Sequence, residues 1–367
     1  MELRPSPLEV VDVDRLFWRN RRVLITGHTG FKGAWLALTL EKAGAELWGL
    51  ALPSRDEGEA FAALKPWPDL VSFEVDLRDE ERTQEAIDQA NPEIVFHLAA
   101  QAYVRTALAQ PSETFGVNVL GTAHLLSALQ HAPDLKAVVV ATTDKVYQDK
   151  GIVHRFREED PLGAREPYAS SKVCTEIAVR SFASTYFDAR QIPLGTVRAG
   201  NVIGGGDWGR DRLVPDAMRA LAARSELLLR HPEATRPWQF VLDVTCGYLS
   251  FAKLLAENRL SAPLAINLGP VDPIQPTVGD VINKLVDLWG EGTWRLERPG
   301  DDVETIALAL DPSLAEETIG WHPAVSLETA LEWTVEWHKA QQAGEDMRSV
   351  SLGQVRRYLN LIAADPH

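Results

Sequence analysis

Short apolar runs alternate with longer amphipathic segments through the first half of the chain. Apolar runs rich in β-branched residues are typical of buried strands, whereas apolar positions three or four residues apart indicate helices. The pattern predicts strands over residues 23–27, 46–52, 71–77, 93–100, 135–143 and 194–202. It predicts helices over residues 31–43, 79–90, 111–130 and 167–187.

This alternation favours an α/β fold with a doubly wound parallel sheet, because neighbouring parallel strands are joined by crossover helices. The pattern becomes irregular after residue 202, where glycines and scattered prolines separate short helical pieces. A clear amphipathic helix returns over residues 326–344. We therefore expect residues 1–202 to form mainly the sheet domain. Residues 203–367 should form mainly a smaller lobe, with a segment near 236–260 returning to the first domain.

Composition excludes several classes of protein. The 367 residues include 37 Lys and Arg against 52 Asp and Glu, a formal net charge of −15, and nucleic-acid binding needs clustered basic residues. The chain has no run of about 18 apolar residues and no apolar signal segment at its start, so we expect no membrane partner. Cys174 and Cys246 are the only cysteines, too few for a disulfide framework or a zinc cluster. We expect a cytoplasmic protein without a metal site.

Three glycines follow the first predicted strand and open the first predicted helix, at Gly27, Gly30 and Gly33. In this position one glycine permits a tight turn, one lets a pyrophosphate approach the backbone, and one allows close packing of helix on sheet. The N-terminus of the helix then offers N–H donors and partial positive charge to the anion. A glycine-rich turn without a ligand is the alternative.

The spacing G-x-x-G-x-x-G resembles that of the extended short-chain dehydrogenase/reductase family, and the likeness runs over roughly residues 20–340. The resemblance implies a Rossmann-like fold, a first domain that binds NAD and a second lobe that binds substrate. It also implies a set of cofactor-binding residues that includes these three glycines. They are Gly27, Thr29, Gly30, Phe31, Lys32, Gly33, Asp76, Leu77, Leu98, Ala99, Ala100, Asn118, Tyr168 and Lys172.

One segment departs from the pattern of the NAD-binding members. These members carry an acid at the end of the second strand, where it holds the adenosine ribose hydroxyls. Residues 50–55 read Leu-Ala-Leu-Pro-Ser-Arg and contain no carboxylate. Arg55 favours a 2′-phosphate, so NADP is the alternative to the NAD that the resemblance implies.

Tyr168 and Lys172 lie one helical turn apart, which places both side chains on one helix face. A lysine ammonium beside the phenol is expected to lower the tyrosine pKa from its usual value of about 10. Tyr168 can then take a proton from a substrate hydroxyl while a hydride leaves. An exposed Tyr–Lys pair without chemistry is the alternative. The resemblance adds Thr143, and makes the three residues a catalytic triad.

Charged residues directly follow the triad hydroxyl, as Asp144 and Lys145. Sugar-nucleotide 4,6-dehydratases carry an acid pair here, and Asp-Lys resembles their CDP-glucose branch, as do residues 27–35, 142–147, 198–208 and 236–241. The resemblance implies conversion of CDP-glucose to CDP-4-keto-6-deoxyglucose and water. Asp144 would protonate the departing C6 oxygen, and Lys145 would either remove the C5 proton or stabilise the enolate. The alternative is a surface ion pair.

Six arginines against four acids make residues 210–236 locally positive, and guanidinium groups suit a diphosphate. We expect substrate contacts from Arg236 first, from Arg298 by its resemblance to a phosphate-contacting stretch, and from Arg210 and Asn201. The family resemblance also implies a homodimer or homotetramer built on the helices predicted over 111–130 and 167–187.

Two other functions compete with the dehydratase. A nucleotide-sugar 4-epimerase or reductase needs the triad but not the Asp144–Lys145 pair. A redox-sensing binding protein would use the dinucleotide fold without chemistry, and such proteins commonly lose the tyrosine or the lysine that this chain retains.

Overall fold

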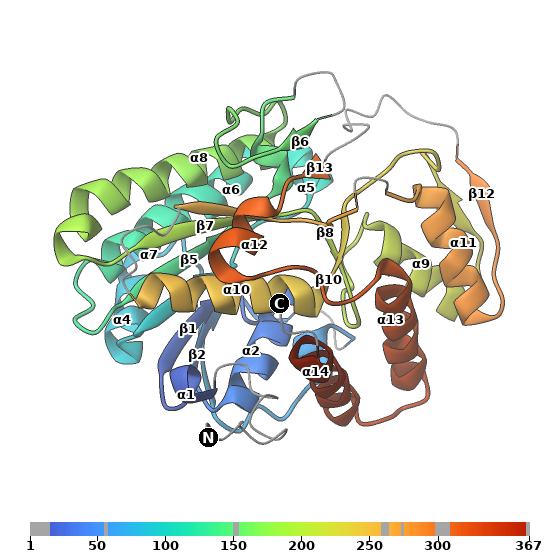
Figure 1. Ribbon diagram of the computed structural model, residues 1–367, viewed down its shortest axis with the longest axis horizontal. Helices are drawn as coiled ribbons and strands as arrows, with labels where there is room; N and C mark the ends of the chain where they lie inside the picture. Colours follow the sequence, from blue (N-terminus) through green and yellow to red (C-terminus); the bar gives the residue numbers. More distant parts are fainter. Residues whose placement is uncertain are drawn as a thin grey trace, which may run out of the picture.

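A seven-stranded parallel sheet organises the protein, in the strand order β11-β7-β5-β4-β1-β2-β3 (Figure 1). The computed structural model describes residues 15–54, 58–149, 154–257, 264–272, 275–297 and 309–364. The α/β doubly wound class predicted from the sequence is confirmed. None of the helices within these ranges is long and apolar enough to cross a membrane.

Strand and helix bounds follow the predicted alternation closely in the first half. The strands of the sheet are β1 (Arg22–Thr26), β2 (Glu46–Ala51), β3 (Leu70–Glu74), β4 (Ile94–His97), β5 (Ala137–Ala141), β7 (Leu194–Ala199) and β11 (Ala265–Leu268). Short strands pair outside it, namely β6 (Arg155–Phe156), β8 (Asn201–Ile203), β9 (Leu227–Leu229), β10 (Trp238–Phe240), β12 (Trp294–Leu296) and β13 (Ala309–Leu310).

The helices before β7 are α1 (Arg15–Trp18), α2 (Phe31–Ala43), α3 (Ala60–Ala63), α4 (Glu80–Ala90), α5 (Val104–Ala109), α6 (Pro111–Phe115), η1 (Gly116–Leu120), α7 (Gly121–Leu129), η2 (Asp144–Val146), α8 (Pro167–Phe182), η3 (Ala183–Phe187) and η4 (Asp188–Arg190). Those after it are α9 (Leu213–Ala222), α10 (Val241–Ala256), α11 (Val278–Trp289), α12 (Ser313–Ile319), α13 (Leu327–Gln342) and α14 (Met347–Ala364).

Both faces of the sheet are buried along β1, β4, β5, β7 and β11, as the nearly continuous apolar strands predict, whereas the edge strand β3 is largely exposed. Side chains alternate along β1, so Val23 and Ile25 join the core under α2 and α10, whereas Leu24 joins the core under α4, α7 and α8. Figure 1 shows α10 lying along the sheet beside α2, with α7 and α8 on the other side. The sheet is therefore a rigid layer from whose carboxyl ends functional loops emerge.

The helix predicted over residues 111–130 is interrupted. A π-helical turn, η1, separates α6 from α7, and Asn118 lies buried within it. Its side-chain amide donates to the carbonyl of Gln101 at 2.9 Å and to Ser171 Oγ at 2.8 Å, while its oxygen accepts from Gln101 N at 2.8 Å. The side chain pairs with the backbone N–H and carbonyl of Gln101 in the loop after β4, and through Ser171 it links that loop to α8.

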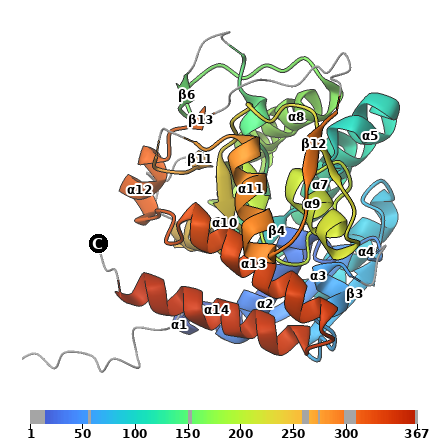
Figure 2. The ribbon, with the colours of Figure 1, turned by 90° about the vertical axis from the view of Figure 1, so that its right-hand side faces the viewer.

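The second half contributes more to the sheet than the sequence analysis expected. After β8, the chain returns through α10, which packs against α2 and β5, and β11 adds a seventh strand beside β7. Helices α9, α11 and α13 gather to one side (Figure 1), and α14 runs beneath α13 and along α2 (Figure 2). The α14 helix was not predicted. Its Arg348 reaches Glu41 of α2, and its Ser351 accepts a hydrogen bond from Trp337.

Candidate active site

The glycine loop joins β1 to α2 at the carboxyl edge of the sheet. Gly27 has φ +73°, and a Cβ there would lie 2.7 Å from Ala99 N. A Cβ at Gly33 would lie 2.2 Å from the carbonyl oxygen of Gly27. Gly30 is different, because a Cβ there would meet only that same oxygen, at 3.3 Å. Turn and packing therefore require glycine at 27 and 33, and the approach in front of Gly30 stays open.

The N-terminus of α2 is suited to an anion. Gly30 is its N-cap and provides no side-chain hydrogen bond, so the first-turn N–H groups face outward without a capping side chain. Lys32 lies in that turn and donates to Tyr248 Oη at 3.2 Å. These features fit the pyrophosphate of a dinucleotide, which these N–H groups and the charge of Lys32 would hold.

The other predicted cofactor residues lie just beyond the strand ends rather than within the strands. Leu98, Ala99 and Ala100 follow β4, and Ala99 N donates to Thr26 Oγ1 at 3.2 Å. Asp76 and Leu77 follow β3; Leu77 is buried in the core, and the Asp76 carboxylate pairs with Arg78 at 2.5 Å. That guanidinium holds the pKa of Asp76 below its usual range. The structure thus brings the cofactor residues to one edge.

His97 and His28 are buried packing residues. The His97 ring bonds Thr26 Oγ1 at 2.7 Å and Thr122 Oγ1 at 2.8 Å, and burial lowers its pKa to about 3. His28 bonds Ser72 Oγ at 2.8 Å, and burial lowers its pKa to about 4. Within the described residues, no three His, Cys, Asp or Glu side chains are grouped to hold a metal ion.

The catalytic candidates converge where β5 ends and α8 begins. Thr143 Oγ1 donates to Asp144 Oδ1 at 2.9 Å, and it lies close enough to the Tyr168 phenol to influence the pKa of that group. Glu166 caps α8 by accepting from Tyr168 N at 2.7 Å, which fixes the helix start. One turn later, Lys172 Nζ donates to the carbonyl of Ala141 at 3.0 Å. A single hydroxyl thus lies between the phenol and the acid.

Burial controls the charges of these groups. It raises the pKa of Tyr168 to about 12, although the Thr143 hydrogen bond and the charge of Arg212 oppose the shift. The expectation that Lys172 lowers the tyrosine pKa is wrong for this structure, because desolvation dominates. Burial lowers the pKa of Lys172 to about 7, with Lys32 adding to the shift.

The acid of the Asp144–Lys145 pair is also governed by desolvation. Burial raises the pKa of Asp144, against the opposing charges of Lys145 and Arg236 and the hydrogen bond from Thr143. A carboxyl group with a raised pKa retains its proton more readily and is suited to act as a general acid. The surface ion pair considered from the sequence is wrong, because Asp144 is 4% exposed.

A buried ion-pair network supports this corner, and the sequence analysis assigned it no role. Glu176 receives two hydrogen bonds of 2.9 Å from Arg198, one of 2.7 Å from Thr142 and one of 2.9 Å from Thr196. The Arg198 guanidinium, the second-largest influence after burial, holds the pKa of Glu176 below its usual range. Tyr168, Lys172 and Glu176 follow one another at four-residue spacing, a signal that could have revealed Glu176.

The predicted substrate residues differ in how close they lie to the catalytic residues. Asn201 begins β8 beside Trp238 of β10, and Arg236 lies near enough for its charge to act on Asp144. Arg210 is exposed, and the structure instead brings Arg212 toward Tyr168, with its guanidinium 5.4 Å from the Tyr103 ring centroid. Arg298, like Arg55, lies outside the described residues.

Comparisons with known proteins agree with this geometry. A model of the NAD dependent epimerase/dehydratase family matches residues 23–269. The chain is 39% identical to a CDP-glucose 4,6-dehydratase of Salmonella typhimurium, over 95% of this chain and 99% of that one.

Solved structures resemble the fold as a whole. An epimerase from Methanothermobacter thermautotrophicus superposes with a TM-score of 0.80 at 22% identity, over 94% of this chain and 99% of the other. A dTDP-glucose 4,6-dehydratase of Streptomyces venezuelae with bound NAD superposes with a TM-score of 0.75 at 23% identity, over 88% and 98%. At these identities the two structures support the fold.

Proposed function

The chain belongs to the NAD dependent epimerase/dehydratase family, and we propose that it is a CDP-glucose 4,6-dehydratase. The product is CDP-4-keto-6-deoxyglucose, formed with loss of one water. The observation that carries this proposal is the position of Thr143, whose hydroxyl donates to the Asp144 carboxyl group at 2.9 Å and lies close enough to the Tyr168 phenol to oppose the rise in its pKa. An epimerase has no use for the buried acid.

Bound NAD supplies the hydride acceptor for C4 and the hydride donor for C6. Tyr168 takes the proton of the sugar O4 as the C4–H bond breaks, a step for which the phenol must be ionised against the effect of its burial. Lys145 takes the C5 proton, and Asp144 gives its proton to the C6 oxygen, which leaves as water. The proton held by Tyr168 then restores Asp144 through the Thr143 hydroxyl, and Lys145 returns a proton to C5. Every proton is accounted for within this corner.

The second lobe, expected from the sequence to comprise mainly residues 203–367, would hold the sugar nucleotide. Arg236 and Arg212 both lie close enough to the reacting corner for their charges to act on Asp144 and Tyr168 respectively. Guanidinium groups form paired hydrogen bonds with phosphate oxygens. We assign the diphosphate to these two residues, with Asn201 beside them, and expect Arg298 to join them.

A homodimer would form through the α7–α8 side of the molecule. Leu120 of η1 and Ile177 of α8 expose 51% and 59% of their surface, and Tyr186 of η3 exposes 47%. Helix pairs with such exposed apolar side chains can associate into a four-helix bundle. Light scattering of Ile177→Asp should show a smaller particle than the wild type if these helices form the contact.

The proposed reaction is tested with purified protein, NAD and a panel of CDP-, UDP-, dTDP- and GDP-glucose. We expect CDP-glucose to be turned over fastest, with a mass loss of one water and solvent deuterium at C5. A product of unchanged mass would identify an epimerase, and preference for another nucleotide would contradict the base assignment.

Two variants separate the steps of this reaction. Tyr168→Phe should lose about 100- to 10,000-fold in turnover and accumulate no reduced cofactor, because its proton acceptor is gone. Asp144→Asn should still oxidise C4, giving the near-ultraviolet absorbance of reduced cofactor, but stall before water loss. Asp188→Asn, an exposed exchange of the same kind, is the control. Normal water loss by Asp144→Asn would show that Asp144 is not the general acid. Normal entry of solvent deuterium at C5 in a third variant, Lys145→Ala, would show that Lys145 is not the base.

A further inference from the structure

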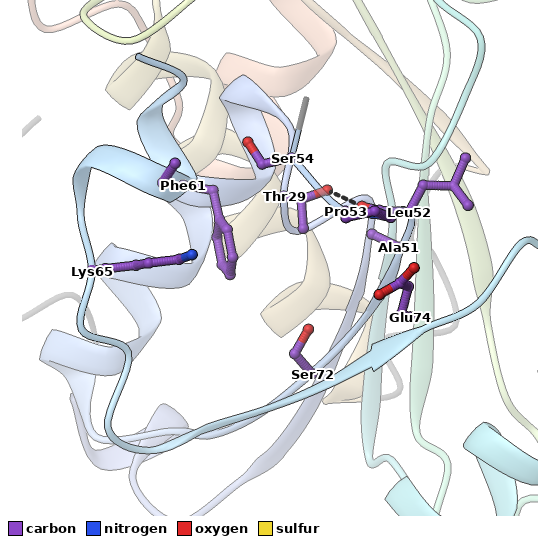
Figure 3. Close-up of a pocket in the computed structure, with 10 residues that line it drawn as sticks. Thr29, Ala51, Leu52, Pro53, Ser54, Phe61, Lys65, Ser72 and Glu74 are labelled. Atoms are coloured by element: carbon purple, nitrogen blue, oxygen red, sulfur yellow. Dashed lines mark hydrogen bonds between the residues drawn. The ribbon is translucent and has the colours of Figure 1, made fainter. Parts of the chain in front are cut away.

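A cavity of about 310 Å³ lies beside the glycine loop, at the carboxyl ends of β2 and β3. Thr29, Ser54, Lys65 and Glu74 are among the residues that line it (Figure 3). In doubly wound folds, this position next to the first βα turn receives the ribose that carries the adenine. The cavity therefore decides which form of the dinucleotide the chain accepts.

The end of β2 carries no acid, but β3 brings one to the same edge. Glu74 is the register partner of Ala51, the last residue of β2. Side chains of register partners in neighbouring parallel strands point to the same face, and so do residues two apart. Ser72 and Glu74 consequently both line the cavity, and Glu74 lies directly beside the strand end where the NAD-binding pattern expects its carboxylate.

The wall around Glu74 offers hydrogen-bond acceptors. Thr29 lines the cavity and its Oγ1 donates its proton to the carbonyl of Leu52 at 2.8 Å, so this hydroxyl can only accept a further hydrogen bond (Figure 3). Ser54, which also lines the cavity, donates to Glu59 Oε2 at 2.5 Å, so a second carboxylate lies next to a lining residue. Ribose hydroxyl groups are donors, whereas a phosphate dianion only accepts and would meet like charge.

Lys65 is the positive group of the cavity. It follows α3, and Figure 3 shows its side chain reaching in from the side opposite Glu74. Alone, this ammonium would attract a 2′-phosphate. With Glu74 opposite, the two charges offset each other, and the remaining acceptors favour a hydroxyl.

We propose that Glu74, supplied by β3 in place of an acid at the end of β2, accepts the hydrogen bonds of the adenosine ribose hydroxyls and excludes a 2′-phosphate. Glu74 is thus the residue that makes this chain specific for NAD over NADP. Lys65 provides a latent affinity for the 2′-phosphate that becomes measurable only when the Glu74 charge is removed.

Calorimetric titration with ADP-ribose and 2′-phospho-ADP-ribose tests this proposal without any turnover. The wild type should bind ADP-ribose at least about 10-fold more tightly. In Glu74→Gln, ADP-ribose should bind about 10-fold more weakly and the phosphorylated ligand more tightly, which reverses or abolishes the preference. Glu46→Gln, at the opposite end of β2 and likewise exposed, should leave both affinities unchanged.

The double variant Glu74→Gln/Lys65→Gln should lose the affinity for 2′-phospho-ADP-ribose that Glu74→Gln gains, because the attracting ammonium is gone. Circular dichroism of each variant checks folding, and Glu74→Ala serves as a second exchange of the acid. An unchanged ligand preference in Glu74→Gln and Glu74→Ala would overturn the proposal, as would a wild type that binds both ligands equally. Because no sugar nucleotide is used, either failure leaves the proposed dehydratase activity untouched.

Discussion

The glycine-loop region and the catalytic corner lie at the same edge of one sheet, but they are built differently. The first uses backbone: Gly27 and Gly33 leave no room for a Cβ, and the N-terminus of α2 supplies N–H groups. The second uses buried charge, in which Glu176 and Arg198 are 0% exposed beneath Thr142. We therefore expect the first region to be disrupted by an added side-chain atom, and the second to be destabilised when one member of the ion pair is removed.

Adding one methyl group to the first region should produce the largest combined effect, because it weakens cofactor binding as well as stability. An alanine at position 33 would place its Cβ 2.2 Å from the Gly27 carbonyl oxygen, which is backbone and cannot move aside cheaply. We expect Gly33→Ala to lose NAD binding by at least about 100-fold and to unfold about 3 kcal/mol more easily. Calorimetric binding and urea unfolding measure the two effects.

Gly30→Ala is the matched control for this experiment. Its backbone lies at φ −79° and ψ 169°, which alanine adopts without strain, and its Cβ meets only one atom, at 3.3 Å. This variant should keep its unfolding free energy. If Gly33→Ala were equally stable, helix–sheet packing would not be the reason for the third glycine.

Removing one partner from the second region should have the next largest effect. Arg198→Met leaves the buried Glu176 carboxylate with the Thr142 and Thr196 hydroxyls and the half-exposed Arg180 guanidinium, 4.0 Å away, as partners. We expect a loss of about 3–5 kcal/mol in the free energy of unfolding, the usual result of breaking a buried ion pair. Urea unfolding measures it.

Neutralising both partners tests whether charge is the cause. The double variant Arg198→Met/Glu176→Gln should recover much of the lost stability, since no uncompensated charge remains. A single variant within about 0.5 kcal/mol of the wild type would show that the network is dispensable, and the contrast between the two regions would not hold.

A buried acid away from both regions should produce the smallest effect for each unit of pH. Burial raises the pKa of Asp243, on α10, to about 7, although hydrogen bonds from Ala324 N and the Tyr358 hydroxyl oppose the shift. Between about pH 4 and pH 7, the folded protein keeps this proton while the unfolded chain has lost it. Stability should therefore fall as pH rises through this window, by up to about 1 kcal/mol per pH unit.

Asp243→Asn should remove this dependence on pH while leaving turnover at a fixed pH nearly unchanged. Thermal unfolding of both proteins across the window provides the measurement. An identical pH slope in the variant would assign the dependence to other groups. The expected result is that ionisation of Asp243 changes the stability of the protein but not the chemistry of the active site.

The glycine loop, the strand–helix alternation and the Tyr168–Lys172 pair were determined by the sequence alone, because each depends on neighbours a few residues apart. Local sterics and helical spacing act within such segments, so their pattern is sufficient. Thr143 and Asp144 were assigned from the family resemblance, at the end of the strand predicted over residues 135–143 and directly after it.

Only the tertiary structure decided which distant groups meet and how deeply they are buried. It added β11 to the sheet, placed Arg212 rather than Arg210 toward Tyr168, and joined Glu176 to Arg198. It also brought Glu74 to the end of β2 through strand register. Desolvation, which raises the pKa values of Asp144 and Tyr168, depends on everything packed around a group, and no local pattern encodes it.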